Sequence, residues 1–306
     1  MPEPDQIALR PGAARNLATV TKTPVQMPAL TPRWLTALLP WKGLEAGVLR
    51  VNRVESNEPT EVACSVPDES ALPQTFTNYA EKPREYVLSS ITTVVNVNTR
   101  VSDLFSSPHD QVQEQLRLAT ESVKERQEHE LLNNADYGLL NNLAAEQRIA
   151  PRRGPPTPDD LDELIARVWK EPAFFLAHPR AIAAFGREAT RRGVPPPTIT
   201  LFGSPFVTWR GLPLIPSDKL PVEGNGAGRS TILLLRVGEE KQGVVGLFQP
   251  GLPGEQSPGL SVRFMGIQAN GVATYLISLY CSAAVLVPDA LGALENVDLG
   301  HYHEYA

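Results

Sequence analysis

The first 45 residues place large apolar side chains among closely spaced prolines and show neither a helical nor a strand period. Each proline removes a backbone donor and fixes φ, so we expect no long helix or central strand here. A short helix is expected at 32–39, with Thr31 as its cap and Pro32 in its first turn. Because an extended segment cannot bury its own large side chains, this arm must lie on a later domain of the chain or on a neighbouring subunit.

Two strand-like runs follow, at 47–54 and 86–101, and the second is almost entirely β-branched at alternate positions. Between them the sequence is rich in prolines and acids. The pattern predicts a large projecting hairpin with an irregular tip. It fits an ordinary sheet element and a loop laid over a neighbour equally well.

Residues 109–135 contain neither glycine nor proline, and their apolar positions repeat at helical spacing. The stripe is Val112, Leu116, Ala119 and Val123. It predicts a helix roughly 40 Å long, one side of which packs on a sheet. A coiled coil is disfavoured because the stripe stops at 126–130.

Two more helices are predicted beyond a linker at 152–158. The first is capped by Thr157, begins at Pro158 and ends before Pro172, and the second spans 179–192 and closes at Gly193. The buried face of the first consists of Leu161, Leu164, Ile165, Val168 and Trp169. Strands are then expected at 199–202, 206–209, 232–237, 243–248, 260–265 and 274–287.

The composition argues against nucleic-acid-binding and membrane-associated classes of protein. Forty-two per cent of residues are hydrophobic and the net charge is −6, which gives no general attraction to nucleic acid or anionic lipid. The 29 prolines are nearly twice the usual share. The apolar run at 272–287 is interrupted by hydroxyl side chains and is too short to span a bilayer. We therefore expect a cytoplasmic protein with no signal peptide and no transmembrane segment.

The candidates for chemistry are few. Cys64 and Cys281 have no histidine nearby in sequence, and His301, His303 and Glu304 form only a terminal cluster. The glycines at 224–228 lack the spacing of a phosphate-binding loop, and Glu239-Glu240 resembles a solvated turn. These patterns predict no catalytic, cofactor or metal site.

Three long stretches resemble one family, the shell proteins of family 2 encapsulins, and in particular their type 2A branch. They are 156–193 (PTPDDLDELIARVWKEPAFFLAHPRAIAAFGREATRRG), 201–222 (LFGSPFVTWRGLPLIPSDKLPV) and 233–267 (LLLRVGEEKQGVVGLFQPGLPGEQSPGLSVRFMGI). Within the second, Ser217, Asp218 and Pro221 match a pattern of phage capsid subunits. The type 2B branch carries an inserted cyclic-nucleotide-binding domain, for which this chain has no room.

The resemblance implies an α+β, tailed-phage major-capsid-like fold. Its parts would be an N-terminal arm (1–45), an extended loop (46–105), a peripheral domain with a spine helix (106–175, completed by 262–287), an axial domain (176–261, completed by 288–300) and a C-terminal tail (301–306).

The implied function is that of a non-enzymatic subunit, about 60 copies of which close into an icosahedral cage. In the type 2A branch the cargo is a cysteine desulfurase that carries pyridoxal phosphate and docks through a disordered N-terminal extension, a link to sulfur metabolism. A phage or prophage capsid protein is the alternative, although a DNA-packaging capsid should be more basic. A hydrolase using Cys281 or the terminal histidines is the third hypothesis.

Two groups of residues are expected to serve assembly. The arm residues predicted to contact another subunit are Trp34, Leu35, Leu38, Leu39 and Trp41. In this fold the axial domains meet around five-fold axes, so loops 223–229 and 238–242 are candidates for pore rims. The pore-lining candidates are Glu223, Asn225, Glu239, Glu240 and Lys241. Repeated acids there would favour cations, although ordinary exposed turns are nearly as good an interpretation.

Overall fold

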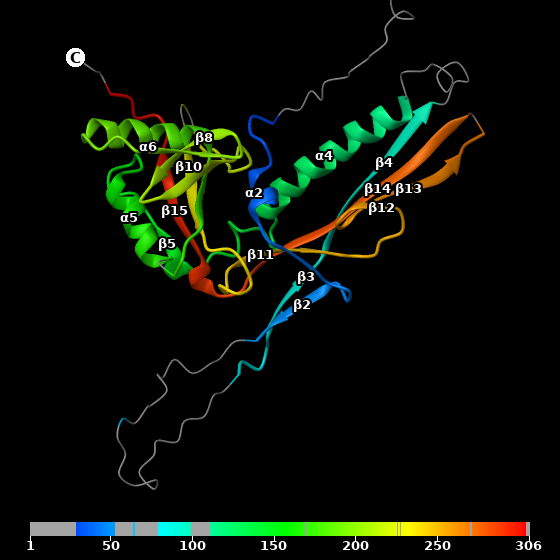
Figure 1. Cartoon of the computed structure of the whole chain (residues 1–306), viewed down its shortest axis with the longest axis horizontal. Coiled ribbons are helices and arrows are strands. Elements are labelled where there is room, and N and C mark those ends of the chain that lie inside the picture. The colour runs from blue at the N-terminus through cyan, green and yellow to red at the C-terminus, as the bar shows by residue number, and fades with distance from the viewer. Residues whose placement is uncertain are drawn as a thin grey trace, which may run out of the picture.

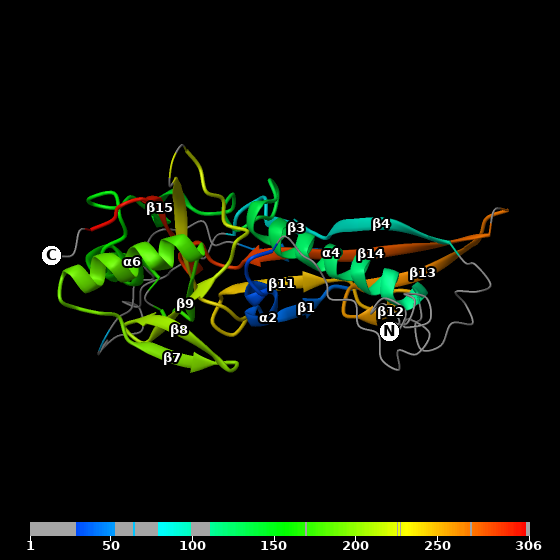
Figure 2. The ribbon, with the colours of Figure 1, turned by 90° about the horizontal axis from the view of Figure 1, so that it is seen from above.

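The computed structural model describes residues 29–52, 64, 79–98, 111–168, 170–224, 226, 228–269 and 271–303. Within them the chain forms two mixed sheets that lie end to end along the long axis of the molecule (Figures 1 and 2). The first 28 residues of the arm, most of the loop tip, Trp169, Asn225 and Glu304 fall outside the described residues.

The first sheet is long and six-stranded, and one long helix lies along it (Figure 1). Its strands are β1 (Trp41–Gly43), β11 (Val244–Phe248), β14 (Val272–Val285), β13 (Leu260–Ile267) and β12 (Glu255–Ser257), with β4 (Ser89–Asn98) on the other side of β14. The helix is α4 (Gln111–Asn133). Three of the four predicted stripe residues, Leu116, Ala119 and Val123, pack against Ile277 and Leu279 of the sheet.

The second sheet has seven strands, in the order β5 (Arg148–Ile149), β15 (Leu291–Asp298), β10 (Arg229–Leu235), β6 (Phe174–Ala177), β9 (Leu212–Pro216), β8 (Ser204–Trp209) and β7 (Thr198–Leu201). Its central strands are buried on both faces, which explains their unbroken apolar runs. Phe175 and Leu234 face α5 (Pro158–Arg167) and α6 (Pro179–Arg191), whereas Leu176 and Leu233 face the first sheet.

The described residues include only the base of the predicted hairpin. β2 (Val48–Val51) and β3 (Arg84–Val87) pair antiparallel as a two-stranded ribbon at the edge of the body, and Tyr86 packs against β11 and β14 of the first sheet (Figure 1). The second predicted strand is divided at Leu88, after which β4 leaves the ribbon to pair with β14 along its whole length. Within the described residues, 86–98, the run therefore divides between the two-stranded ribbon and an ordinary sheet strand.

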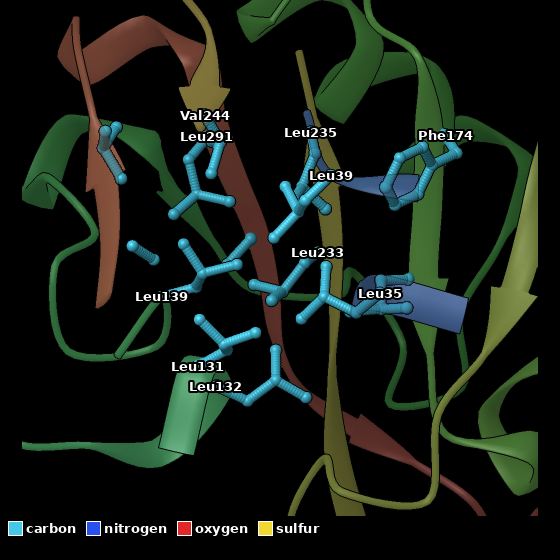
Figure 3. Close-up of a cluster of buried hydrophobic side chains, with 14 of the residues drawn as sticks. Leu35, Leu39, Leu131, Leu132, Leu139, Phe174, Leu233, Leu235, Val244 and Leu291 are labelled. Atoms are coloured by element: carbon cyan, nitrogen blue, oxygen red, sulfur yellow. The ribbon is translucent and has the colours of Figure 1, made fainter. Parts of the chain in front are cut away.

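A junction core joins the two sheets, and the arm helix α2 (Trp34–Leu38) is part of it (Figure 3). Leu35 and Leu39 pack there with Leu131 and Leu132 from the end of α4 and with Leu233 from β10. Two short 3-10 turns, Ala145–Gln147 and Pro288–Ala290, complete the connections. The burial of α4 thus continues past residue 130, where the sequence pattern had suggested that it stops.

The helix starts give one confirmation and one correction. Thr157 caps α5 as predicted, in a reciprocal capping box with Asp160. Thr31 does not cap α2, whose N-cap is Arg33 without a side-chain cap bond. The Thr31 hydroxyl instead exchanges hydrogen bonds with Asp218, which lies 187 residues further along the chain. The backbone N–H of Asp218, distant in the sequence, has replaced the local backbone donor.

Sheet membership differs from the predicted domain boundaries in two places. Residues 158–175 were assigned to the peripheral domain, but α5 and β6 pack in the second sheet. Residues 244–261 were assigned to the axial domain, but β11 and β12 belong to the first sheet. The chain crosses between the sheets at 236–243, and it returns at 286–290.

Candidate functional site

The five arm residues predicted to contact another subunit behave differently from one another. Leu35 and Leu39 are 0% and 3% exposed within their own chain, so neither has surface left for a neighbour. For these two the prediction is wrong, because the junction core of the same chain takes up their area. Trp34, Leu38 and Trp41 are only partly buried against that core, and their contact with another subunit stays a prediction.

Trp34 marks the most aromatic part of the arm. Its ring meets Phe206 edge to face at a centroid distance of 5.3 Å and stacks on Phe202 at 5.5 Å. Phe202 is 68% exposed, at the turn between β7 and β8. An apolar groove runs beside Trp34 between Pro32, Ile182 and Leu214. The arm therefore adds aromatic surface to the second sheet as well as filling the core.

A cluster of charged groups holds residues 30–33 of the arm, and the sequence patterns did not reveal it. Asp218 accepts from the Leu30 backbone amide at 2.6 Å and from the Thr31 hydroxyl at 2.9 Å. Arg33 bridges Glu121 and Glu125 of α4 at 2.7 and 2.8 Å. The only available signal was Asp218 itself, in the capsid-like Ser-Asp pattern. Its arm partners are separated by too many residues for any local rule to pair them.

The two predicted pore loops do not come together within one subunit. Glu223 pairs with Arg229 at the start of β10, through backbone hydrogen bonds of 2.8 and 2.7 Å. Glu239 follows the other end of β10, and a seven-residue strand spans about 23 Å. At most one of the two loops can therefore approach a given symmetry axis closely.

The loop at 238–242 lies where the chain crosses between the sheets. Glu239 forms an ion pair with Lys42 of β1, and Lys241 forms one with Glu171 at 2.9 Å. Each acid so paired contributes less field than a bare carboxylate would. The pore role of Glu223, Glu239, Glu240 and Lys241 stays a prediction, and Asn225 lies outside the described residues.

The candidates for chemistry are dispersed. Cys64 is exposed, whereas Cys281 is buried in β14, and burial raises the pKa of its thiol to about 12. His303 contacts Glu188 at 2.9 Å, and His178 accepts from the Arg180 amide at the start of α6, as expected for a helix start. Across the described ranges, His, Cys, Asp and Glu nowhere gather in threes suited to a metal ion.

No helix in the described part of the chain combines the length and the apolar composition needed to cross a bilayer. The longest, α4, is covered with charged side chains outside its narrow apolar stripe.

A long helix on an extended sheet, a second helix-covered sheet and a two-stranded ribbon define the tailed-phage major-capsid-like class of proteins. Solved capsids share this fold at low identity: that of a native GTA particle has a TM-score of 0.62 and 13% identity over 95% of this chain and all of the other, and that of Microbacterium phage Oxtober96 has 0.62 and 12% over 92% and 97%. These two show the fold alone.

Within that class, residues 48–301 match the model of the SrpI-like type 2A encapsulin shell proteins. The chain is 64% identical to the type 2A encapsulin shell protein SrpI of Synechococcus elongatus over 98% of its length and 97% of the relative's. It is 58% identical to the shell protein of Mycolicibacterium paratuberculosis over 96% and 95%. In the cryo-EM structure of the holo-SrpI encapsulin complex, a subunit superposes with a TM-score of 0.84 at 61% identity, over 98% of this chain and all of the other. The chain belongs to the type 2A encapsulin shell protein family.

Proposed function

We propose that about 60 copies of this shell protein assemble without help into a closed icosahedral compartment in the cytoplasm. The observation that carries the proposal is the superposition of nearly the whole chain, at a TM-score of 0.84, on a subunit of an encapsulin complex. Sixty is the number of equivalent positions in icosahedral symmetry, so a single subunit type needs no second conformation.

The compartment would enclose a cysteine desulfurase and serve sulfur metabolism. Support for an enclosed protein comes from the similarity to a shell described as a holo complex, and the desulfurase follows from the resemblance to the type 2A branch. Under this proposal the desulfurase carries pyridoxal phosphate and docks through a disordered N-terminal extension. The shell subunit contributes containment rather than catalysis.

Co-expression tests the cargo. The shell protein is produced with a cysteine desulfurase that has such an extension and, separately, with the same enzyme lacking it. We expect the complete enzyme to co-sediment with shells and to stay protected from added protease, while the shortened enzyme stays outside. Equal recovery of both forms would refute docking through the extension, and recovery of neither would refute this cargo.

A phage capsid role is not favoured by any particular observation. The phage capsid and the GTA capsid match this chain at 12–13% identity, whereas the two encapsulin relatives match it at 58% and 64%. The acidic balance of the chain, −6 in formal charge, also suits DNA packaging poorly.

A further inference from the structure

One acidic side chain of α4 is buried where the arm, α4 and the segment after β9 meet. Glu128 is 1% exposed, and its Oε1 accepts a hydrogen bond of 2.9 Å from the Ser217 hydroxyl, which is itself fully buried. The other carboxylate oxygen, Oε2, is shielded from solvent and has no hydrogen-bond partner among the described residues. A buried carboxylate in such a place is costly when it is ionised.

Three elements surround this carboxyl with charge. The arm contributes Arg33, and α4 contributes Glu121 and Glu125. The segment after β9 contributes Asp218 and Lys219, with the Lys219 ammonium 2.5 Å from Asp218 and 2.9 Å from Glu125.

Two cations and three anions already stand there, so ionising Glu128 adds a second unbalanced negative charge one helical turn from Glu125. At the start of α6, His178 interacts electrostatically with Asp218 of this cluster and with Arg180.

We infer that the Glu128 carboxyl is a proton-operated clasp, which holds the arm against α4 and Asp218 while it is protonated and loosens the arm when it ionises. The clasp goes beyond containment, because it makes the seating of the arm depend on pH. Since Leu35 and Leu39 fill the junction core, loosening the arm also weakens the contact between the two sheets.

The direction of the effect follows from the titration. Burial raises the pKa of Glu128 to about 7, and Glu125 adds to the rise, while the Ser217 hydrogen bond, Lys219 and the backbone amide of Thr36 in the arm oppose it. A freely exposed glutamate titrates near 4.3. The seated arm therefore binds a proton that the released arm has already lost, so seating is strongest at low pH and weakens as the pH rises through 7. Burial and Arg180 lower the pKa of His178, so its charging would oppose the clasp only on the acid side.

Hydrogen–deuterium exchange of residues 30–39 in the assembled protein tests the clasp at pH 6 and pH 8, after correction for intrinsic exchange rates. We expect the opening constant to rise about tenfold between the two pH values in the wild type and to stay flat in Glu128→Gln. Glu85→Gln is the matched control, since it removes an exposed carboxylate of β3 that pairs with Arg50 outside this cluster, and it should keep the tenfold rise. A flat wild type, or a tenfold rise in Glu128→Gln, would overturn the inference.

Ser217→Ala provides a second test, which still applies if Glu128→Gln does not fold. Removing the hydroxyl takes away a hydrogen bond that favours the ionised carboxylate, so the midpoint of the exchange profile should move to higher pH. An unmoved midpoint contradicts the clasp. Particle sizing of each variant keeps this result separate from assembly, because a wild type that fails to form shells refutes the proposed function and not the clasp.

Discussion

The indole of Trp41 lies directly against Gly246, its register partner in β11, so that a Cβ built on Gly246 would come within 2.6 Å of the ring. The indole nitrogen also donates to the Thr36 carbonyl at 2.9 Å, which ties the ring back to the arm helix. The end of the arm is thereby fixed to the first sheet by a contact that only glycine permits.

Gly246→Ala should therefore push β1 away from β11 and lower stability by about 2 kcal/mol, the usual cost of overpacking a core. Gly186→Ala is the control, because its new methyl group meets nothing within 4 Å and alanine favours a helix. Thermal melting should show a lower Tm for the first variant and an equal or higher Tm for the second. Equal melting of both would mean that the Trp41 contact is loose.

Leu35→Ala should cost about 3 kcal/mol, because the side chain is fully buried and its loss leaves a cavity in the junction core. Leu30→Ala, at a site 79% exposed, should change stability by less than about 0.5 kcal/mol. Denaturant unfolding of the two variants measures the difference. A small effect of Leu35→Ala would contradict the place of the arm inside the subunit core.

Asp289→Ala should cost on the order of 3 kcal/mol, because it leaves the buried guanidinium of Arg236 without its 2.7 Å partner at the crossing between the sheets. Glu85→Ala is the matched control: it breaks an exposed Arg50 pair of 2.7 Å and should cost less than about 1 kcal/mol. Similar unfolding free energies for the two variants would contradict the difference in burial.

The same pair predicts a pH dependence. Burial raises the pKa of Asp289, but hydrogen bonds from Arg236 and Lys170 outweigh it and hold the pKa below its usual value. This contribution is therefore present above about pH 4 and is lost as the pH falls through the lowered pKa. Acid unfolding of Asp289→Ala should show a smaller loss of stability below pH 4 than the wild type. An acid profile identical to that of the wild type would show that the Asp289–Arg236 pair does not contribute to stability.

The two thiols should react differently. Cys64 is exposed, whereas Cys281 is buried and has a thiol pKa of about 12, raised by burial and by Glu130. A thiol reagent should label Cys64 alone in the native protein and both cysteines after denaturation. Rapid native labelling of Cys281 would contradict its burial and revive the hydrolase interpretation, which needs a reactive thiolate.

The helices were predictable because their signals are local. The Thr157 cap, the four-three-four stripe of α4 and the glycine after α6 each act within a few residues. Several strands were missed for an equally physical reason. β6 is only four residues long, β9 begins and ends beside prolines, and Asn296 gives β15 a residue at positive φ. Their pairing partners lie far away in the chain.

The function was inferred from a family resemblance, whereas the junction core became visible only in the structure. No spacing rule connects Thr31 to Asp218 or Glu128 to Ser217, because each pair is separated by more than 80 residues. Likewise the sequence showed that the arm needs a cover, but Leu35 alone could not say whether its own chain or a neighbour provides it. Only the packed core of the structure shows that its own chain covers Leu35.

Imaging the protein expressed alone, together with its native mass, tests the central claim most directly. The account predicts closed icosahedral particles of about 60 subunits, or about 2 MDa for a 33.4 kDa chain. A protein that stays a monomer or dimer at micromolar concentration, with no closed particles in the micrographs, would contradict it.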